Sequence, residues 1–183
     1  MKNIINLLFE ANILKEIPRS GYQFLGAGKE SIAEHTFTTV MIAFVMSKIE
    51  TDVDALKLIS MCLVHDLPEA RTGDLNTVHK QYVTANESQA VRDTVKDLPF
   101  GASIADLIQE FNAGQTREAQ LAHDADQLAL TVDLKSLVDI GYQPPNKWLP
   151  HVLGRLKTQT GKNIGQHIME THRDDWWLSD IEH

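Results

Sequence analysis

Helical periodicity along almost the entire chain is the feature that most constrains its fold. Apolar residues recur every three or four positions in segment after segment, and almost no stretch alternates as a strand on a sheet surface would. The sequence has no internal repeat, no low-complexity segment and no convincing linker. With 183 residues, one unit can bury a substantial core. We therefore expect an all-α single domain that spans residues 1–183.

Capping and turn residues divide the chain into separate helices. Ser31 and Glu34 have the spacing of a capping box, and Asp52 or Asp54 can cap the following helix. Pro68 is expected to end or kink that helix. The predicted helices cover residues 2–16, 31–50, 55–66, 79–97, 103–112 and 116–140, with two shorter helices within 147–175 and a Trp pair directly after them.

The acidic composition excludes several classes of partner. The formal net charge is -8, and no cluster of Lys and Arg forms a basic face, which argues against a nucleic acid polymer. No apolar run approaches the roughly 20 residues that cross a bilayer, so we expect no membrane partner. Cys62 is the single cysteine, and a chain without a possible internal disulfide favours the cytoplasm. We expect Cys62 to be an inert core thiol.

Three of the predicted helices direct a metal-ligand side chain toward the core. His35, His65 and Asp126 each lie on the apolar stripe of a different helix, and Asp66 adjoins His65. An isolated buried carboxylate is costly unless it is paired or bound to a metal. Two imidazoles and two carboxylates suit Mn, Co, Fe, Ni or Zn better than Ca. Taken singly, each histidine could be a hydrogen-bonded core residue, and Asp126 could pair with an arginine.

The order of these residues resembles the signature of the HD-domain metal-dependent phosphohydrolases. Five segments look like successive blocks of the subgroup that contains the bacterial 5'-deoxynucleotidases and the HD domain-containing protein 2 family. They are PRSGY (18–22), ESIAEH (30–35), HDLPEARTGD (65–74), TREAQLAHDADQL (116–128) and LKTQTGKNIGQHIMETHRDDWW (156–177). The resemblance implies an HD-domain helical bundle with a central metal site. Its metal-site core would cover about residues 31–140, and C-terminal helices and a tail would cover 147–183.

The resemblance also implies roles for individual residues around one divalent metal, which is Mn, Co, Mg, Fe, Ni or Zn. Glu69 matches the catalytic acid/base, and Pro68 could shift it relative to the metal. Asp74 matches the aspartate of a Gly-Asp pair with a catalytic or substrate-binding role, although a plain turn aspartate is the alternative. The implied metal ligands are His35, His65, Asp66 and Asp126.

Substrate contacts are expected from the loop before the metal helix and from the segment after the Gly-Asp pair. Arg19 is implied to hold the substrate phosphate, and its planar guanidinium suits that task. Tyr22 stands where many relatives carry Trp, which keeps an aromatic substrate contact. Lys80 could supply a second cation, but an ordinary solvated lysine is an equally good interpretation. His123 and Asp124 are expected on other helix faces, at the surface or behind the ligands.

These observations together predict a metal-dependent phosphohydrolase that acts on ribo- or deoxyribonucleoside 5'-monophosphates, in particular the 2'-deoxy ones. The alternatives are an HD phosphohydrolase for another nucleotide, such as a cyclic nucleotide or a triphosphate, and a non-catalytic nucleotide-binding regulatory module. A helical interaction protein with paired polar core residues is a weaker alternative. The resemblance also implies a homodimer. Trp176 and Trp177 are expected to pack the tail onto the bundle or onto a second subunit.

Overall fold

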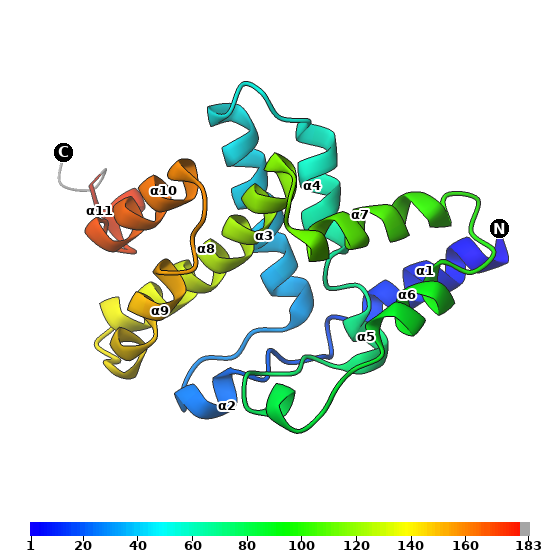
Figure 1. The fold of residues 1–183 in the computed structure, drawn as a ribbon. Coiled ribbons are helices and arrows are strands. Elements are labelled where there is room, and N and C mark those ends of the chain that lie inside the picture. The colour runs from blue at the N-terminus through cyan, green and yellow to red at the C-terminus, as the bar shows by residue number, and fades with distance from the viewer. Residues whose placement is uncertain (180–183) are drawn as a thin grey trace.

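Three helices form the centre of the protein in the computed structural model, which describes residues 1–179 (Figure 1). They are α3 (Ile32–Ile49), α4 (Ala55–Val64) and α8 (Arg117–Asp139), and each packs against the other two. No strand occurs within the described residues. The prediction of an all-α fold is confirmed.

The other helices extend to both sides of this centre (Figure 1). α1, α5, α6 and α7 lie on one side, whereas α9, α10 and α11 lie along α8 on the other. Their bounds are α1 (Lys2–Ile13), α2 (Tyr22–Leu25), α5 (Glu69–Thr72), the 3-10 helix η1 (His79–Gln81), α6 (Glu87–Val95), α7 (Gly101–Ala113), the 3-10 helix η2 (Pro144–Lys147), α9 (Leu149–Leu153), α10 (Gln159–Glu170) and α11 (Asp175–Leu178).

Small residues on α8 let the central helices approach closely. Ala119, Ala122 and Ala125 are fully buried and pack with large apolar side chains of α3 and α4, among them Met46 and Leu58. Burying each large side chain contributes about 1.5–3 kcal/mol. The predicted inward stripes of the three helices are therefore the faces that form the core.

Cys62 lies inside this core as a free thiol. Burial raises its pKa far above the usual range, because the thiolate would lose its hydration there. The predicted core position of Cys62 is confirmed, and the raised pKa supports the prediction that the thiol is inert.

The start of α3 is fixed by two sets of hydrogen bonds. Ser31 and Glu34 form the predicted capping box, in which each side chain accepts from the other's backbone N–H. In addition, the Ile32 N–H donates to the Ile17 carbonyl, and the Arg19 N–H donates to the Glu30 carbonyl at 2.8 Å. The loop before α3 therefore runs back along the first turn of that helix and holds Arg19 close to it.

The prediction of one continuous helix over 79–97 is wrong, because this segment contains two separate helices, η1 and α6. A short turn at η1 is followed by residues without regular secondary structure, and α6 begins only at Glu87. The Asn86 side chain accepts the Gln89 N–H at 3.1 Å, which caps a new helix. Val83 and Thr84 are β-branched, which also disfavours a continuous helix here. Asp54, rather than Asp52, caps α4.

The apolar residues of α1 divide between two faces. Leu7 and Ala11 pack toward Ile32 of α3, whereas Ile5, Leu8, Phe9 and Ile13 are exposed. Trp176 is 80% exposed, so the prediction that it packs onto the bundle is wrong; contact with a second subunit stays a prediction. None of the helices within residues 1–179 has the length and apolarity needed to cross a membrane.

Candidate metal centre and substrate cavity

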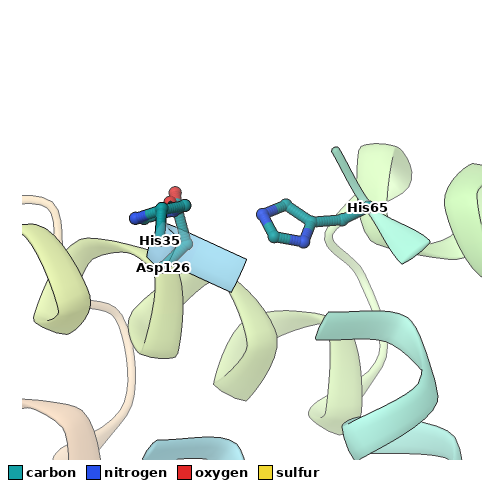
Figure 2. Close-up of side chains that lie close together, drawn as sticks. All are labelled: His35, His65 and Asp126. Carbon is teal, nitrogen blue, oxygen red and sulfur yellow. The ribbon is translucent and has the colours of Figure 1, made fainter. Parts of the chain in front are cut away.

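Three predicted ligands come together where α3, α4 and α8 meet (Figure 2). One possible ligand atom from each of His35, His65 and Asp126 lies within 4.8 Å of those of the other two. His35 Nε2 is 2.8 Å from Asp126 Oδ1. Both histidines are buried. Residues separated by up to 91 positions in the sequence thus form one cluster of nitrogen and oxygen ligands.

Hydrogen bonds orient the His65 ring. Its Nδ1–H donates to the Cys62 carbonyl at 2.8 Å, because a carbonyl can only accept. The Nε2 atom is therefore the one left free to bind a metal, and Figure 2 shows the ring directed toward His35 and Asp126. Such a bond on the far nitrogen is typical of metal-binding histidines.

Asp66 lies beside this cluster but outside the three most closely grouped residues. Its Oδ2 is 3.2 Å from His65 Nε2, 4.0 Å from His35 Nε2 and 3.7 Å from Arg19 Nη1. His65 Nε2 and Asp66 Oδ2 are buried without a hydrogen-bond partner among the described residues. Leaving such atoms unsatisfied costs about 1–3 kcal/mol each. A divalent cation would satisfy both, so this donor set fits the expected metal.

The charges of the cluster depend strongly on one another. Burial opposes the ionised form of Asp126, but its hydrogen bond to His35 and the nearby positive charges hold its pKa well below the usual range. Burial likewise opposes the charged form of His65, but the Asp66 carboxylate outweighs it and raises the pKa to about 9. The carboxylates therefore give this centre a strong affinity for positive charge.

Pro68 leaves the turn between α4 and α5 close to helical. Its φ of -60° and ψ of -22° are helical values, and it immediately precedes α5, where its missing N–H costs little. The Glu69 N–H donates to the Asp66 carbonyl at 3.0 Å. Glu69 is thus held one short turn after Asp66, and the proline does not remove it from the centre.

Glu69 has the environment of a proton-transferring carboxyl group. Its Oε2 is buried without a hydrogen-bond partner among residues 1–179. Burial, followed by the charges of Asp66 and Asp74, raises its pKa to about 9. The positive charge of a bound metal would oppose this shift and favour the carboxylate. Burial thus favours the protonated form of Glu69, and a bound metal would favour the ionised form.

Asp74 connects the Gly-Asp loop to the loop that carries Arg19. Its Oδ2 accepts the Ser20 N–H at 2.6 Å. Arg19 stays protonated because, although burial opposes its charge, Asp126, Asp66 and Asp74 raise its pKa. The structure therefore places a fixed cation beside the metal cluster and gives one Asp74 oxygen a structural role.

One cavity of about 660 Å³ joins most of the predicted site residues. His35 is buried behind it. Lys80 is exposed at its edge, and Tyr22 packs against Gly28, whose φ of +80° and close contact with the ring both require glycine. The predicted residues that line the cavity are Arg19, Tyr22, His65, Asp66, Glu69, Asp74, Lys80 and Asp126.

Some residues around the centre were missed by the sequence analysis. Glu30 Oε2 lies 3.7 Å from His35 Nδ1, and the Gln127 amide donates to Asp126 Oδ2 at 2.8 Å. The Phe111 ring packs between His65 and His123. Glu30 and Gln127 had only closeness in sequence to a predicted ligand as a signal, since periodicity places Gln127 on a different helix face from Asp126. Phe111 had no such signal.

Asp124 is a buried structural residue, so the expectation of a surface position is wrong. Its carboxylate accepts the backbone N–H groups of Lys157 and Thr158, each at 2.8 Å, and also the Thr158 hydroxyl. Thr158 in turn caps α10. Asp124 therefore fixes α10 against α8 rather than contributing to the metal centre.

The fold and the centre define a helical protein built around a site for a divalent metal. The chain belongs to the HD domain family, which matches residues 11–168. The 5'-deoxynucleotidase HDDC2 of Dictyostelium discoideum is 27% identical over 160 residues, which cover 80% of this chain and 84% of the relative.

Solved structures agree with this fold. A conserved hypothetical protein from Pyrococcus furiosus aligns with a TM-score of 0.75 and 25% identity, covering 91% of this chain and 99% of its own. A predicted metal-dependent phosphohydrolase from Magnetospirillum magnetotacticum aligns with a TM-score of 0.72 and 20% identity, covering 92% and 90%. The predictions of an HD-family hydrolase and of a divalent metal cofactor are confirmed at the level of the family.

Proposed function

We propose that this protein is a phosphomonoesterase that hydrolyses nucleoside 5'-monophosphates, including 2'-deoxy ones, to nucleoside and phosphate. The main support is that the metal-ligand cluster, Glu69 and Arg19 open into one cavity. The similarity to a protein named 5'-deoxynucleotidase supports the choice of substrate class. We also propose that Asp66 completes the ligand set of His35, His65 and Asp126.

The side chains around the cavity suit the separate tasks of this reaction. A divalent ion would lower the pKa of water and polarise a phosphoryl oxygen. Arg19 binds the phosphate through its guanidinium and holds it beside Asp66. The water oxygen forms a bond to phosphorus, and the bond from phosphorus to the 5' oxygen breaks. Glu69 accepts the proton of the water and returns a proton to the departing 5' oxygen.

The remaining predicted residues are proposed to contact the sugar and the outer part of the substrate. Asp74 Oδ2 is used by the Ser20 N–H, so its other oxygen is the one that would accept a hydrogen bond from the sugar. Tyr22 provides an aromatic wall, and its buried hydroxyl has no hydrogen-bond partner among the described residues. Lys80, at the edge of the cavity, adds a cation for an anionic substrate.

A panel of nucleotides assayed with Mn or Co tests the proposal. Ribo- and deoxyribonucleoside 5'-monophosphates should yield inorganic phosphate and nucleoside, and chelation of the metal should stop the reaction. Tripolyphosphate released from nucleoside triphosphates, or turnover of cyclic nucleotides alone, would identify a different phosphohydrolase. Metal-supported nucleotide binding without turnover would identify a regulatory module.

We also propose that a second copy of the chain covers an apolar face formed by α3 and α4. These helices pack together, and they leave large apolar side chains exposed on their outer sides, namely Phe37, Met41, Phe44, Leu56 and Leu63. On each helix these side chains recur at helical spacing, and an exposed apolar helix face often marks a protein–protein contact. Sedimentation analysis should give twice the chain mass for the native protein, and Phe37→Glu should produce monomers. A monomeric native protein would contradict the homodimer.

The cytoplasm is the location that we propose, because the one cysteine is a buried free thiol that needs no oxidising compartment. Cell fractionation tests this, and recovery of the protein in an exported fraction would contradict it.

A further inference from the structure

The cavity extends well beyond the metal cluster. Its volume of about 660 Å³ lies in the range typical of sites that enclose a complete small molecule. The far wall comes from the segment after α8, and its lining residues there include Trp148, Val152 and Arg155. A phosphate held by Arg19 and the metal would leave this part of the cavity for the rest of the substrate.

Trp148 lies next to the loop that carries Arg19. It packs in one cluster with Tyr22, Leu134 and Val152. A Cβ atom added to Gly21, two residues after Arg19, would lie 3.9 Å from Trp148 Cζ3. Trp148 is only half-buried and contributes to the cavity surface. The indole thus connects the phosphate-binding loop to the far wall of the same cavity.

The chemistry of this wall suits a planar, partly apolar group. Leu130, Leu134 and Val152 line the cavity together with Trp148 and give this wall apolar surface. Stacking on an aromatic ring tolerates any of the bases, because each base presents a π face. Trp148 keeps part of its side chain accessible, whereas Leu134 and Val152 beside it are almost fully buried.

We propose that Trp148 forms the base-binding subsite, on which the base of a nucleoside 5'-monophosphate stacks while its phosphate lies against Arg19. This inference rests on the proposed function and adds to it a location for the base. The subsite recognises the shape and π face of the base, whereas Arg19 and the metal recognise the phosphate.

Kinetics of Trp148→Leu test the proposal, because leucine keeps an apolar side chain but removes the aromatic face. The KM for a nucleoside monophosphate should rise by about tenfold. Deoxyribose 5-phosphate, which lacks a base, should keep its inhibition constant as a competitor, and kcat should change by less than about twofold. Trp148→Phe should restore most of the nucleotide affinity. Phe100→Leu, at an exposed aromatic residue outside this cavity, is the control and should behave as wild type.

The outcomes separate this inference from the proposed function. An unchanged KM in Trp148→Leu, or an equal weakening of nucleotide and deoxyribose 5-phosphate, overturns the base subsite while nucleotide hydrolysis by the wild type stands. No phosphate release from any nucleoside monophosphate by the wild type overturns the proposed function, and the inference with it.

Discussion

Asp126→Asn is expected to lower the affinity for divalent metal by at least about 100-fold and to abolish hydrolysis. Even substitutions of residues behind the ligands commonly cost 10–100-fold in metal affinity or activity. Asp126 provides a carboxylate that its surroundings keep ionised, and its Oδ1 lies at the centre of the cluster. Asparagine keeps the shape and one oxygen but removes the charge. Titration of the metal-free protein with Mn measures the loss.

Thermal unfolding gives a second measurement of the same change. A metal present at 100 times its Kd stabilises the folded state by about 2.7 kcal/mol. For a chain of this size that corresponds to an increase in Tm of roughly 5–10 °C. Wild type should show this increase with Mn, and Asp126→Asn should not. Asp133→Asn, two turns further along α8 and outside the cavity, is the matched control. Wild-type Mn affinity in Asp126→Asn would exclude Asp126 as a ligand.

Glu69→Gln is expected to reduce kcat by about 10²–10⁴-fold while leaving metal affinity within a few-fold of wild type. The amide has nearly the same shape as the carboxyl group, but it can neither accept nor return the transferred proton. Glu69 lines the cavity beside the cluster, and its buried Oε2 has no hydrogen-bond partner among the described residues. Phosphate release under saturating nucleotide and metal measures the effect.

Glu87→Gln provides the comparison for Glu69, because Glu87 is an exposed glutamate that lines the same cavity. It removes one negative charge from the cavity without changing a proton-transferring group, so kcat should stay close to wild type. Equal activity in Glu69→Gln and Glu87→Gln would contradict the acid/base role. A loss of metal binding in Glu69→Gln would instead assign Glu69 to the ligand set.

Periodicity predicted the core helices well, because the residues that share a face of a long helix are determined by its geometry. His35, His65 and Asp126 are directed inward, as their apolar neighbours indicated. The same reasoning failed over 79–97, where the side chain of Asn86 starts a new helix. On α1, the amphipathic pattern does not distinguish a face that packs in the core from one left exposed.

The site was predictable where its residues fall in compact motifs and not where tertiary contacts assemble it. The ligands and Glu69 lie within recognisable segments, so their resemblance to a family could be read directly. Trp148 lies more than 20 residues after Asp126, on a wall created only by the packing of the C-terminal helices against α8. Glu30 reaches His35 through the course of a loop, which periodicity does not describe.

The hydrogen bond from the Ser20 N–H to Asp74 ties the loop that carries Arg19 to the Gly-Asp loop, so the two loops should move together. A substitution at Asp74 would release the backbone next to Arg19, so it would alter where the guanidinium meets a phosphate. If Arg19 holds the phosphate as proposed, a substitution at position 74 would change phosphate affinity through the loop, without replacing a group that touches the phosphate. Substitutions in the Gly-Asp loop would thus change the position of the Arg19 guanidinium.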